Sequence, residues 1–188
     1  GAPAQLAKHL VIAKLKPILE NPSLKKVGHN LKYDMSVLAQ HGIFLAGIEF
    51  DTMLESYVVD SVATRHDMDS LAEKYLDETT TKFTDIAGKG AGQLTFNQVA
   101  LEHAAPYAAE DADITLRLHR VLWPQLGKQE TLARVLKDIE IPLLPILSKI
   151  ERTGALIDDT LLFQQSSELT QRINELEVDA WELAGQQF

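Results

Sequence analysis

Three side chains are of types that take part in catalysis in many enzymes. Tyr107 and Asp111, in the stretch YAAED, are four residues apart. On a helix this spacing places a phenol and a carboxylate on one face, about one turn apart. Asp34 ends the stretch NLKYD, where a helical pattern begins. Carboxylate oxygens are ligands for hard divalent cations, so these residues are candidates for metal-assisted chemistry.

Each signal has a structural alternative. An isolated Tyr-x-x-x-Asp pair is more typical of a half-buried tyrosine beside a solvated carboxylate. Asn30 before a helical segment is typical of a helix N-cap, which would leave Asp34 exposed in the first turn. The residues alone therefore leave both interpretations open.

The amino-acid composition limits which residues could bind a metal ion and how the chain could bind nucleic acid. The chain has 188 residues, of which 45% are hydrophobic and 24% charged, which indicates a globular protein. It contains no cysteine, so a metal would be held by Asp, Glu or His. The six histidines show no metal-ligand spacing. The net charge of -9 argues against extensive non-specific wrapping of nucleic acid.

Hydrophobic periodicity predicts how these residues are positioned. Helical spacing over residues 5–20, interrupted by Pro17, precedes a short strand in LKKVGHN. A helix over residues 31–40 and a β-prone run over residues 43–50 follow, then a helix over residues 52–62. This alternation favours parallel strands joined by helical crossovers.

The second half of the sequence is predicted to be helical. A short helix over residues 69–76 precedes a loop, residues 77–93, that contains one helical turn. Its GKGAG stretch lacks the context of a phosphate-binding loop. Phe83 in this loop is either a small core anchor or a stacking surface for a base. Thr95 and Gln98 form a capping box that opens the next helical region, which Pro106 is expected to divide.

The C-terminal part has its own helices. The stretch GKQETLA, residues 127–133, is the best boundary by composition. Beyond it, Pro142 or Pro145 marks a helix start and Gly154 a helix end. The last helix carries an apolar seam that requires a partner. The seam residues are Leu162, Leu169, Ile173, Leu176, Ala180 and Leu183.

Three stretches together resemble one family. NLKYD at residues 30–34, FDTMLESYVVDSVATRHDMDSLAEKYL at 50–76 and YAAEDAD at 107–113 occur in an order and at intervals similar to the proofreading 3'-5' exonuclease domain of bacterial family A DNA polymerases. The tail IEIPLLPILSKIERTGALID resembles the start of the polymerase domain. The resemblance implies an α/β, ribonuclease H-like exonuclease fold over residues 1–127, followed by a helical extension, the first helices of the polymerase domain, over 128–188.

The resemblance also implies roles for individual residues. Asp34 and Asp111 would be metal ligands of a site with two divalent ions (Mg²⁺, Mn²⁺ or Zn²⁺), and Tyr107 would orient the attacking water. Four further residues would lie along the single-stranded 3' end of DNA, with Phe83 against bases and Arg65 near phosphate or sugar. These are Asn30, Arg65, His66 and Phe83. A surface Arg65 paired with Asp67 or Asp69 is an equally good interpretation.

The family's first motif, an Asp-x-Glu on the first strand, has no counterpart here. We therefore expect a truncated fold in which helices dominate, and a fragment that is inactive alone, with no ordered magnesium and at most one weakly held Mn²⁺ or Zn²⁺. The strand edge left unpaired would favour self-association or retention of the missing piece.

At the level of the whole protein, two functions compete. The first is DNA synthesis with 3'-5' proofreading in DNA replication and repair, with the single-stranded 3' end and the rest of the polymerase chain as partners. The second is a catalytically silent, exonuclease-like scaffold beside a polymerase. No apolar run of membrane-spanning length or signal sequence is found, so we expect a soluble intracellular protein. The family resemblance further implies a cytoplasmic, nucleoid-associated bacterial protein.

Overall fold

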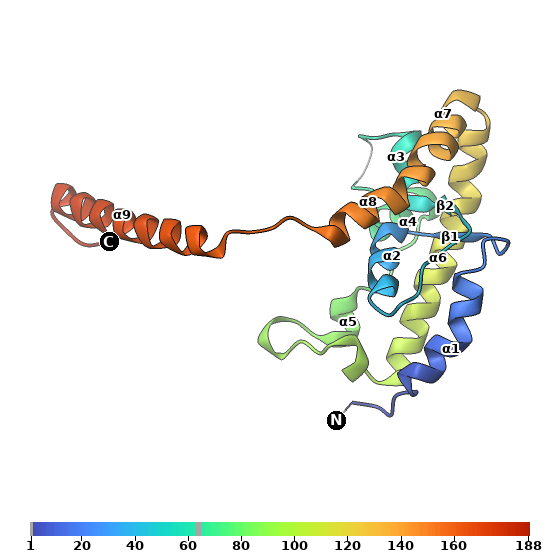
Figure 1. Ribbon diagram of the computed structural model, residues 1–188, viewed down its shortest axis with the longest axis horizontal. Coiled ribbons are helices and arrows are strands. Elements are labelled where there is room, and N and C mark those ends of the chain that lie inside the picture. The colour runs from blue at the N-terminus through green and yellow to red at the C-terminus, as the bar shows by residue number, and fades with distance from the viewer. Residues whose placement is uncertain (1, 63–64) are drawn as a thin grey trace. The chain divides into compact units, whose positions relative to one another are not determined.

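The computed structural model describes residues 2–62 and 65–188 (Figure 1). The chain forms two compact units, Gly1–Arg152 and Thr153–Phe188. The first unit contains the parallel strands β1 (Lys26–Gly28) and β2 (Ile48–Asp51). Its α-helices are α1 (Lys8–Leu19), α2 (Leu31–Ala39), α3 (Thr52–Val59), α4 (Met68–Leu76), α5 (Phe83–Ala87), α6 (Leu101–Gly127), α7 (Glu130–Val135) and α8 (Ile141–Thr153). Two 3₁₀ turns, η1 (Gly90–Gly92) and η2 (Phe96–Gln98), and a π-helical segment, η3 (Leu136–Glu140), complete it.

The sheet confirms the predicted crossover. β1 pairs with β2 in parallel, with Gly28 opposite Asp51, and α2 connects the two strands. The β-prone run over residues 43–50 is only partly extended, because the strand begins at Ile48. Gly47 precedes it with φ of +73°, and a Cβ there would lie 2.5 Å from the carbonyl oxygen of Leu24. Glycine is therefore required for the close approach of these two backbones.

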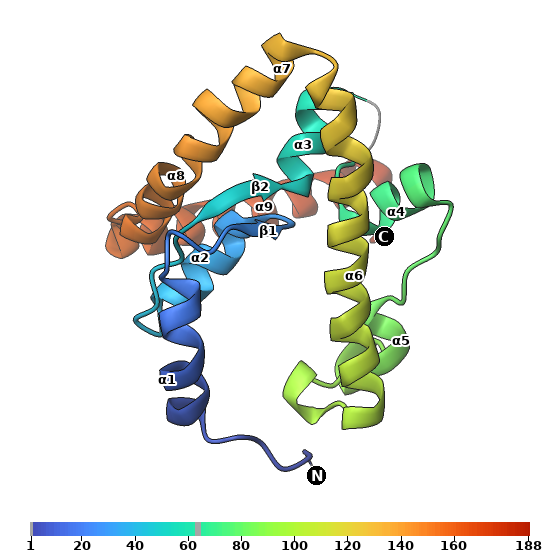
Figure 2. The same cartoon turned by 90° about the vertical axis from the view of Figure 1, so that its right-hand side faces the viewer.

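The long helix α6 organises the core. Ile114, Leu118 and Leu122 on this helix pack against Leu71 and Ala72 of α4. Helix α6 also contacts α3 and β1, and Figure 2 shows α3, α4 and α5 along its length. Burial of these leucine side chains is worth about 1.5–3 kcal/mol each. The core thus fixes α6, and with it Tyr107 and Asp111, against the sheet.

Two expectations about proline and capping were wrong. Helix α6 continues through Pro106 instead of dividing there. The proline removes one backbone hydrogen bond, but Ala104 on one side and Ile114 on the other are both buried, so packing holds the helix together. The Thr95–Gln98 capping box is present, yet it opens the single turn η2, and α6 starts only at Leu101. Helix α1 similarly passes Pro17 and ends at Leu19.

The helix boundaries predicted for the C-terminal part are found only in part. The helical run continues through Pro142 and Pro145, and α8 ends at Thr153, before Gly154 with φ of +68°. The second unit contains α9 (Asp159–Ala184), which is capped by Asp158 and ends at the left-handed Gly185. None of the residues of α9 is buried. Among the described residues, no helix combines the length and apolarity needed to cross a bilayer.

Candidate active site

A cavity of about 470 Å³ lies where β1 and α2 meet α4 and α6. Asp34 from α2 and Asp111 from α6 both line it. These two carboxylates are 77 positions apart in the sequence, and the packing of α6 against β1 brings them to one place. The other lining residues are Val27, Gly28, His29, Met68, Ala108, Ala112 and Thr115.

The electrostatics of this cavity favour a cation. Partial burial, and then the charge of Asp51, raises the pKa of Asp34. Burial, followed by the charges of Glu110 and Asp69, raises the pKa of Asp111. A partly desolvated carboxylate beside other negative charges resists ionisation, and a bound cation would relieve this cost.

Tyr107 lies one helical turn before Asp111, as predicted. Its pKa is raised by burial and by the charge of Asp111, so the phenol remains protonated at neutral pH. A neutral phenol can both donate and accept a hydrogen bond. The phenol lies on the same face of α6 as the Asp111 carboxylate.

Asp51 positions the start of α2, a role that the sequence analysis missed. The side chain is fully buried and accepts hydrogen bonds from the backbone N–H groups of Asn30 (3.2 Å) and Leu31 (2.7 Å). It also caps α3 through the N–H groups of Met53 (3.0 Å) and Leu54 (3.3 Å). One carboxylate thus satisfies the first turns of two helices, and it fixes the element that carries Asp34.

Asn30 occupies the N-cap position of α2, but its side chain makes no capping hydrogen bond. The expectation that it caps the helix was wrong in this respect, because Asp51 supplies the acceptor. Its backbone is left-handed, with φ of +58°. The sequence contained a signal for the cap of α3 by Asp51, since an aspartate directly before a helical run is a common N-cap, but none for its cap of α2.

A polar side-chain pair joins α3 and α6. Glu55 of α3 is fully buried, and its Oε1 lies 2.8 Å from Nδ1 of His119. Burial, and then the charge of Asp51, raises the pKa of Glu55 to about 8, and burial lowers the pKa of His119. At neutral pH Glu55 is therefore protonated, and its carboxyl O–H donates a hydrogen bond to Nδ1 of His119. Glu55 Oε2 has no hydrogen-bond partner among residues 2–62 and 65–188.

Two aromatic rings, those of Phe83 and Phe96, lie beside the ring of Tyr107. The ring centroids of Phe83 and Tyr107 are 6.3 Å apart, those of Phe96 and Tyr107 are 6.1 Å apart, and those of Phe83 and Phe96 are 6.5 Å apart. Phe83 packs on the buried cluster of Ala87 and Val99 and is half-buried. It is thus a core anchor that also faces the other two rings.

Arg65 and His66 lie outside the carboxylate cavity. Arg65 Nε is 3.4 Å from Asp67 Oδ2, and the arginine side chain is largely exposed. Arg65 lines a separate polar cavity of about 320 Å³, with Asp67 and Lys82. His66 Nδ1 lies 2.9 Å from Ser56 Oγ, so the ring is held against α3.

The cavity offers two carboxylates as possible ligands for a metal ion. Within residues 2–62 and 65–188, no group of three or more His, Cys, Asp or Glu side chains is close enough to hold one. Asp34 and Asp111 are the two carboxylates that line the cavity. Their oxygen atoms fit a hard divalent cation, and the site supplies part of a ligand set.

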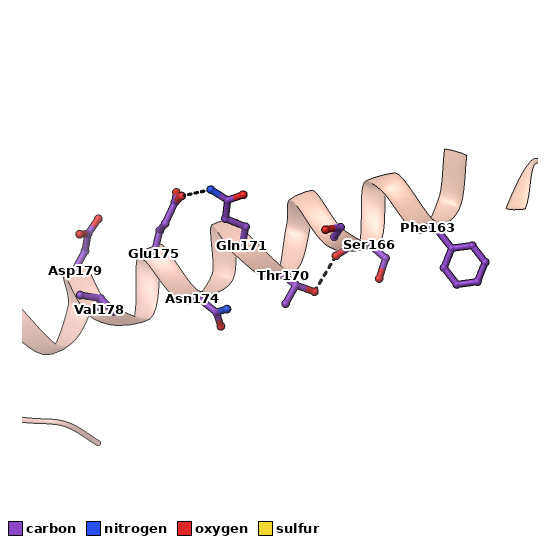
Figure 3. A pocket seen from close by; sticks show the side chains of 9 residues that line it. Phe163, Ser166, Thr170, Gln171, Asn174, Glu175, Val178 and Asp179 are labelled. Atoms are coloured by element: carbon purple, nitrogen blue, oxygen red, sulfur yellow. Dashed lines mark hydrogen bonds between the residues drawn. The ribbon is translucent and has the colours of Figure 1, made fainter. Parts of the chain in front are cut away.

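A hollow along α9 offers no comparable chemistry (Figure 3). All of its lining side chains come from this one helix, and in Figure 3 they point to different sides of it. The lining residues are Phe163, Ser166, Ser167, Thr170, Gln171, Asn174, Glu175, Val178 and Asp179. A groove with a single helical wall does not enclose a small molecule.

The helical packing around a small parallel sheet defines a class, the ribonuclease H-like 3'-5' exonuclease fold. A protein-family profile described as 3'-5' exonuclease matches residues 2–127, so the chain belongs to the 3'-5' exonuclease family of family A DNA polymerases. The resemblance noted in the sequence is thereby confirmed. The predicted domain boundary at residue 127 stays a prediction.

Named relatives agree with this family. DNA polymerase I of Pseudomonas aeruginosa is 59% identical over 190 residues, which covers 100% of this chain and 21% of that protein. DNA polymerase I of Rhizobium leguminosarum is 42% identical over 184 residues, covering 98% of this chain and 18% of that protein. The chain therefore spans about a fifth of the length of these curated relatives.

Two solved structures have a similar fold. The polymerase-domain structure of Pol1 from M. smegmatis, in complex with DNA primer-template and dNTP, aligns with a TM-score of 0.69 and 26% identity over 94% of this chain and 27% of that chain. NrnC of Brucella melitensis, bound to pGG, aligns with a TM-score of 0.59 and 22% identity over 80% of this chain and 67% of that chain. The second likeness concerns the fold alone.

Proposed function

We propose that this chain forms part of the proofreading site of a DNA polymerase, where single-stranded 3' ends are hydrolysed with the help of divalent cations. The observation that carries the proposal is the shared cavity of Asp34 and Asp111, with Tyr107 one turn from Asp111. Membership in the 3'-5' exonuclease family supports it.

In this proposal Asp34 and Asp111 hold Mg²⁺, Mn²⁺ or Zn²⁺ together with ligands from the rest of the polymerase. Two bound cations would neutralise charge on the attacking and leaving oxygens of a phosphodiester and make a water molecule more acidic. Tyr107 orients that water through its neutral phenol, and the raised pKa keeps the phenol protonated. The packing of α6 on β1 keeps these groups in register.

Four residues bind the substrate strand in this proposal. Phe83 stacks on a base from its half-buried position beside Tyr107. Arg65 gives up its exposed pairing with Asp67 for a phosphate or sugar, a low-cost exchange because exposed ion pairs are weak. Asn30 and His66 contact the strand from the starts of α2 and α4.

For the whole protein, we propose DNA-templated DNA synthesis with 3'-5' editing, in a bacterial cytoplasm and in association with the nucleoid. The named relatives are DNA polymerases I from bacteria, which supports this proposal. A catalytically silent scaffold is the second candidate. Retention of Asp34, Tyr107 and Asp111 favours the editing enzyme over the scaffold.

The test uses the full-length polymerase that contains this chain, with Asp34→Ala and Asp111→Ala made separately. We expect each variant to lower hydrolysis of a single-stranded 3' end by about a hundredfold or more, while polymerisation is unchanged. Asp113→Ala is the matched control, since Asp113 lies on the same helix but pairs with Arg117. Normal editing by the double variant, or no editing by the unmodified protein, would refute the assignment.

A further inference from the structure

Phe96 is an exposed aromatic side chain that the roles above leave unexplained. Its ring is 46% exposed and lies 6.1 Å from the ring of Tyr107. We propose that Phe96 is a second stacking side chain for the substrate strand and binds an unpaired base on the 5' side of the base that contacts Phe83. The inference rests on the proposed exonuclease function.

Phe96 lies outside the buried cluster next to it. That cluster, formed by Ala87, Val99 and Ala104, is covered by the partly buried Phe83 and Ile86. Phe96 packs against the rings of Phe83 and Tyr107, and 46% of its surface remains in solvent. A base stacked on the exposed part would bury further apolar surface.

The turn that carries Phe96 is held in place. Gln98 Oε1 accepts a hydrogen bond from the backbone N–H of Thr95 at 2.9 Å, and the Thr95 hydroxyl lies 2.9 Å from the same oxygen. The N–H of Leu94 donates to the carbonyl oxygen of Ala87 at 2.8 Å. A ring on a fixed turn loses little conformational entropy when it stacks, so it is suited to binding.

The arrangement of the rings suggests one base for each exposed ring. The ring planes of Phe96 and Phe83 are inclined by 42°, and those of Phe96 and Tyr107 by 53°. Inclined rings cannot share one continuous stack, but each presents a separate face. Tyr107 lies one turn before Asp111, and Phe83 and Phe96 lie at similar distances from its ring, so a second base stacked on Phe96 would lie next to the base that contacts Phe83.

Charge makes stacking the more important source of affinity. The chain has a net charge of -9, so phosphate neutralisation by this chain is limited. Aromatic stacking is worth about 1–3 kcal/mol for each base and does not depend on sequence. This property suits an editing site that must accept any mismatched 3' end.

The experiment compares Phe96→Ala with the unmodified full-length polymerase on single-stranded oligothymidylate. We expect Phe96→Ala to raise KM by about 5- to 150-fold, which corresponds to the loss of one stacked base, with little change in kcat. Phe96→Trp should restore binding. Phe96→Leu keeps an apolar side chain for packing and should bind weakly although it is folded. Phe44→Ala is the matched control, because Phe44 is 62% exposed and does not line the carboxylate cavity.

A second series of substrates locates the contact. Each oligonucleotide has one abasic position, moved stepwise from the 3' end. The rise in KM caused by Phe96→Ala should disappear for the one oligonucleotide that lacks the base contacting Phe96. With that substrate the unmodified protein has no base to stack on Phe96 either. An equal penalty at every position, or no penalty for Phe96→Leu and Phe96→Ala, would overturn the proposal. If Asp34→Ala also retained full activity, the exonuclease assignment would have failed instead.

Discussion

Two carboxylates near the start of α2 are used in opposite ways. Asp51 is fully buried and accepts hydrogen bonds from four backbone N–H groups. The Asp34 side chain is exposed where it lines the cavity, but nearby protein atoms partly desolvate its carboxylate, and this desolvation and the charge of Asp51 raise its pKa. Backbone N–H groups of the fold stabilise the charge of Asp51, whereas the charge of Asp34 is disfavoured by the nearby Asp51.

This difference distinguishes a carboxylate that stabilises the fold from one that is available to a ligand. A carboxylate that is saturated by backbone donors stabilises the fold and has little capacity left for a ligand. A carboxylate in a negative, partly desolvated cavity is costly to keep ionised and gains from a cation. Asp51 and Asp34 are therefore coupled, because the same charge that fixes α2 also raises the pKa of Asp34.

The largest change in stability is expected from Asp51→Ala. The substitution leaves four backbone N–H groups at two helix starts without their acceptor, so we expect a loss of about 3–5 kcal/mol in the free energy of unfolding. Urea denaturation of the full-length protein measures this loss in the free energy of unfolding. Amide hydrogen exchange at residues 30–31 and 53–54 shows whether the two helix starts are affected.

Asp67→Ala is the control for Asp51→Ala. Asp67 caps only α4, through the N–H of Ser70 at 3.0 Å, so its loss should cost about 1 kcal/mol. Asp34→Ala should change stability by less than about 1 kcal/mol, since it is an exposed first-turn carboxylate. Equal costs for all three variants would abolish the distinction between the structural and the chemical carboxylate.

A smaller, pH-dependent change is expected from Glu55. Its folded-state pKa of about 8 exceeds the ordinary value of 4.5, so the folded state holds a proton that the unfolded state releases. The stability that this proton provides is complete below about pH 4.5 and is lost as the pH rises through about 8. We expect a decline on the order of a few kcal/mol across this window.

Glu55→Gln tests the origin of that decline. The glutamine amide can donate to His119 Nδ1 as the protonated acid does, so the variant should remain folded and its stability should vary less with pH. Denaturant melts at pH 5, 7 and 9 measure the difference, with Glu102→Gln at the start of α6 as the control. A Glu55→Gln variant with the same slope as the unmodified protein would show that the carboxyl is ionised throughout.

Local patterns predicted the elements but not their joint geometry. The strand in LKKVGHN, the crossover helix and the helix over residues 69–76 follow from periodicity and punctuation, and the structure contains all three. Pro106 was misjudged because burial on both sides of it outweighs one missing hydrogen bond. Sequence rules for helix breaking count the hydrogen bond that a proline removes, but they do not include the tertiary packing that compensates for it.

The candidate site shows the same division. Tyr107 and Asp111 on one helical face follow from their spacing. Their approach to Asp34 depends on long-range packing of α6 on β1, and the family resemblance, not periodicity, indicated it. Asp51 was missed because its cap of α2 comes from a residue that follows α2 in the chain. N-cap rules consider only the residue that directly precedes a helix.

The smallest change in stability is expected at Asn30, where structure and proposed function are most easily separated. Its side chain does not cap α2, while its backbone has φ of +58°, which glycine adopts without strain. Asn30→Gly should therefore change the free energy of unfolding by less than about 0.5 kcal/mol, and Asn30→Ala should cost about 1 kcal/mol, because alanine is strained in this conformation.

Hydrolysis provides the second measurement on the same two variants. If Asn30 contacts the substrate strand, Asn30→Gly and Asn30→Ala lack the same amide and should slow hydrolysis of single-stranded DNA to a similar extent, despite their different stabilities. Denaturant melts and initial rates on the full-length polymerase give both quantities. Loss of activity that follows loss of stability would instead assign Asn30 a purely conformational role, in which Asp51 and a left-handed residue together set the start of α2.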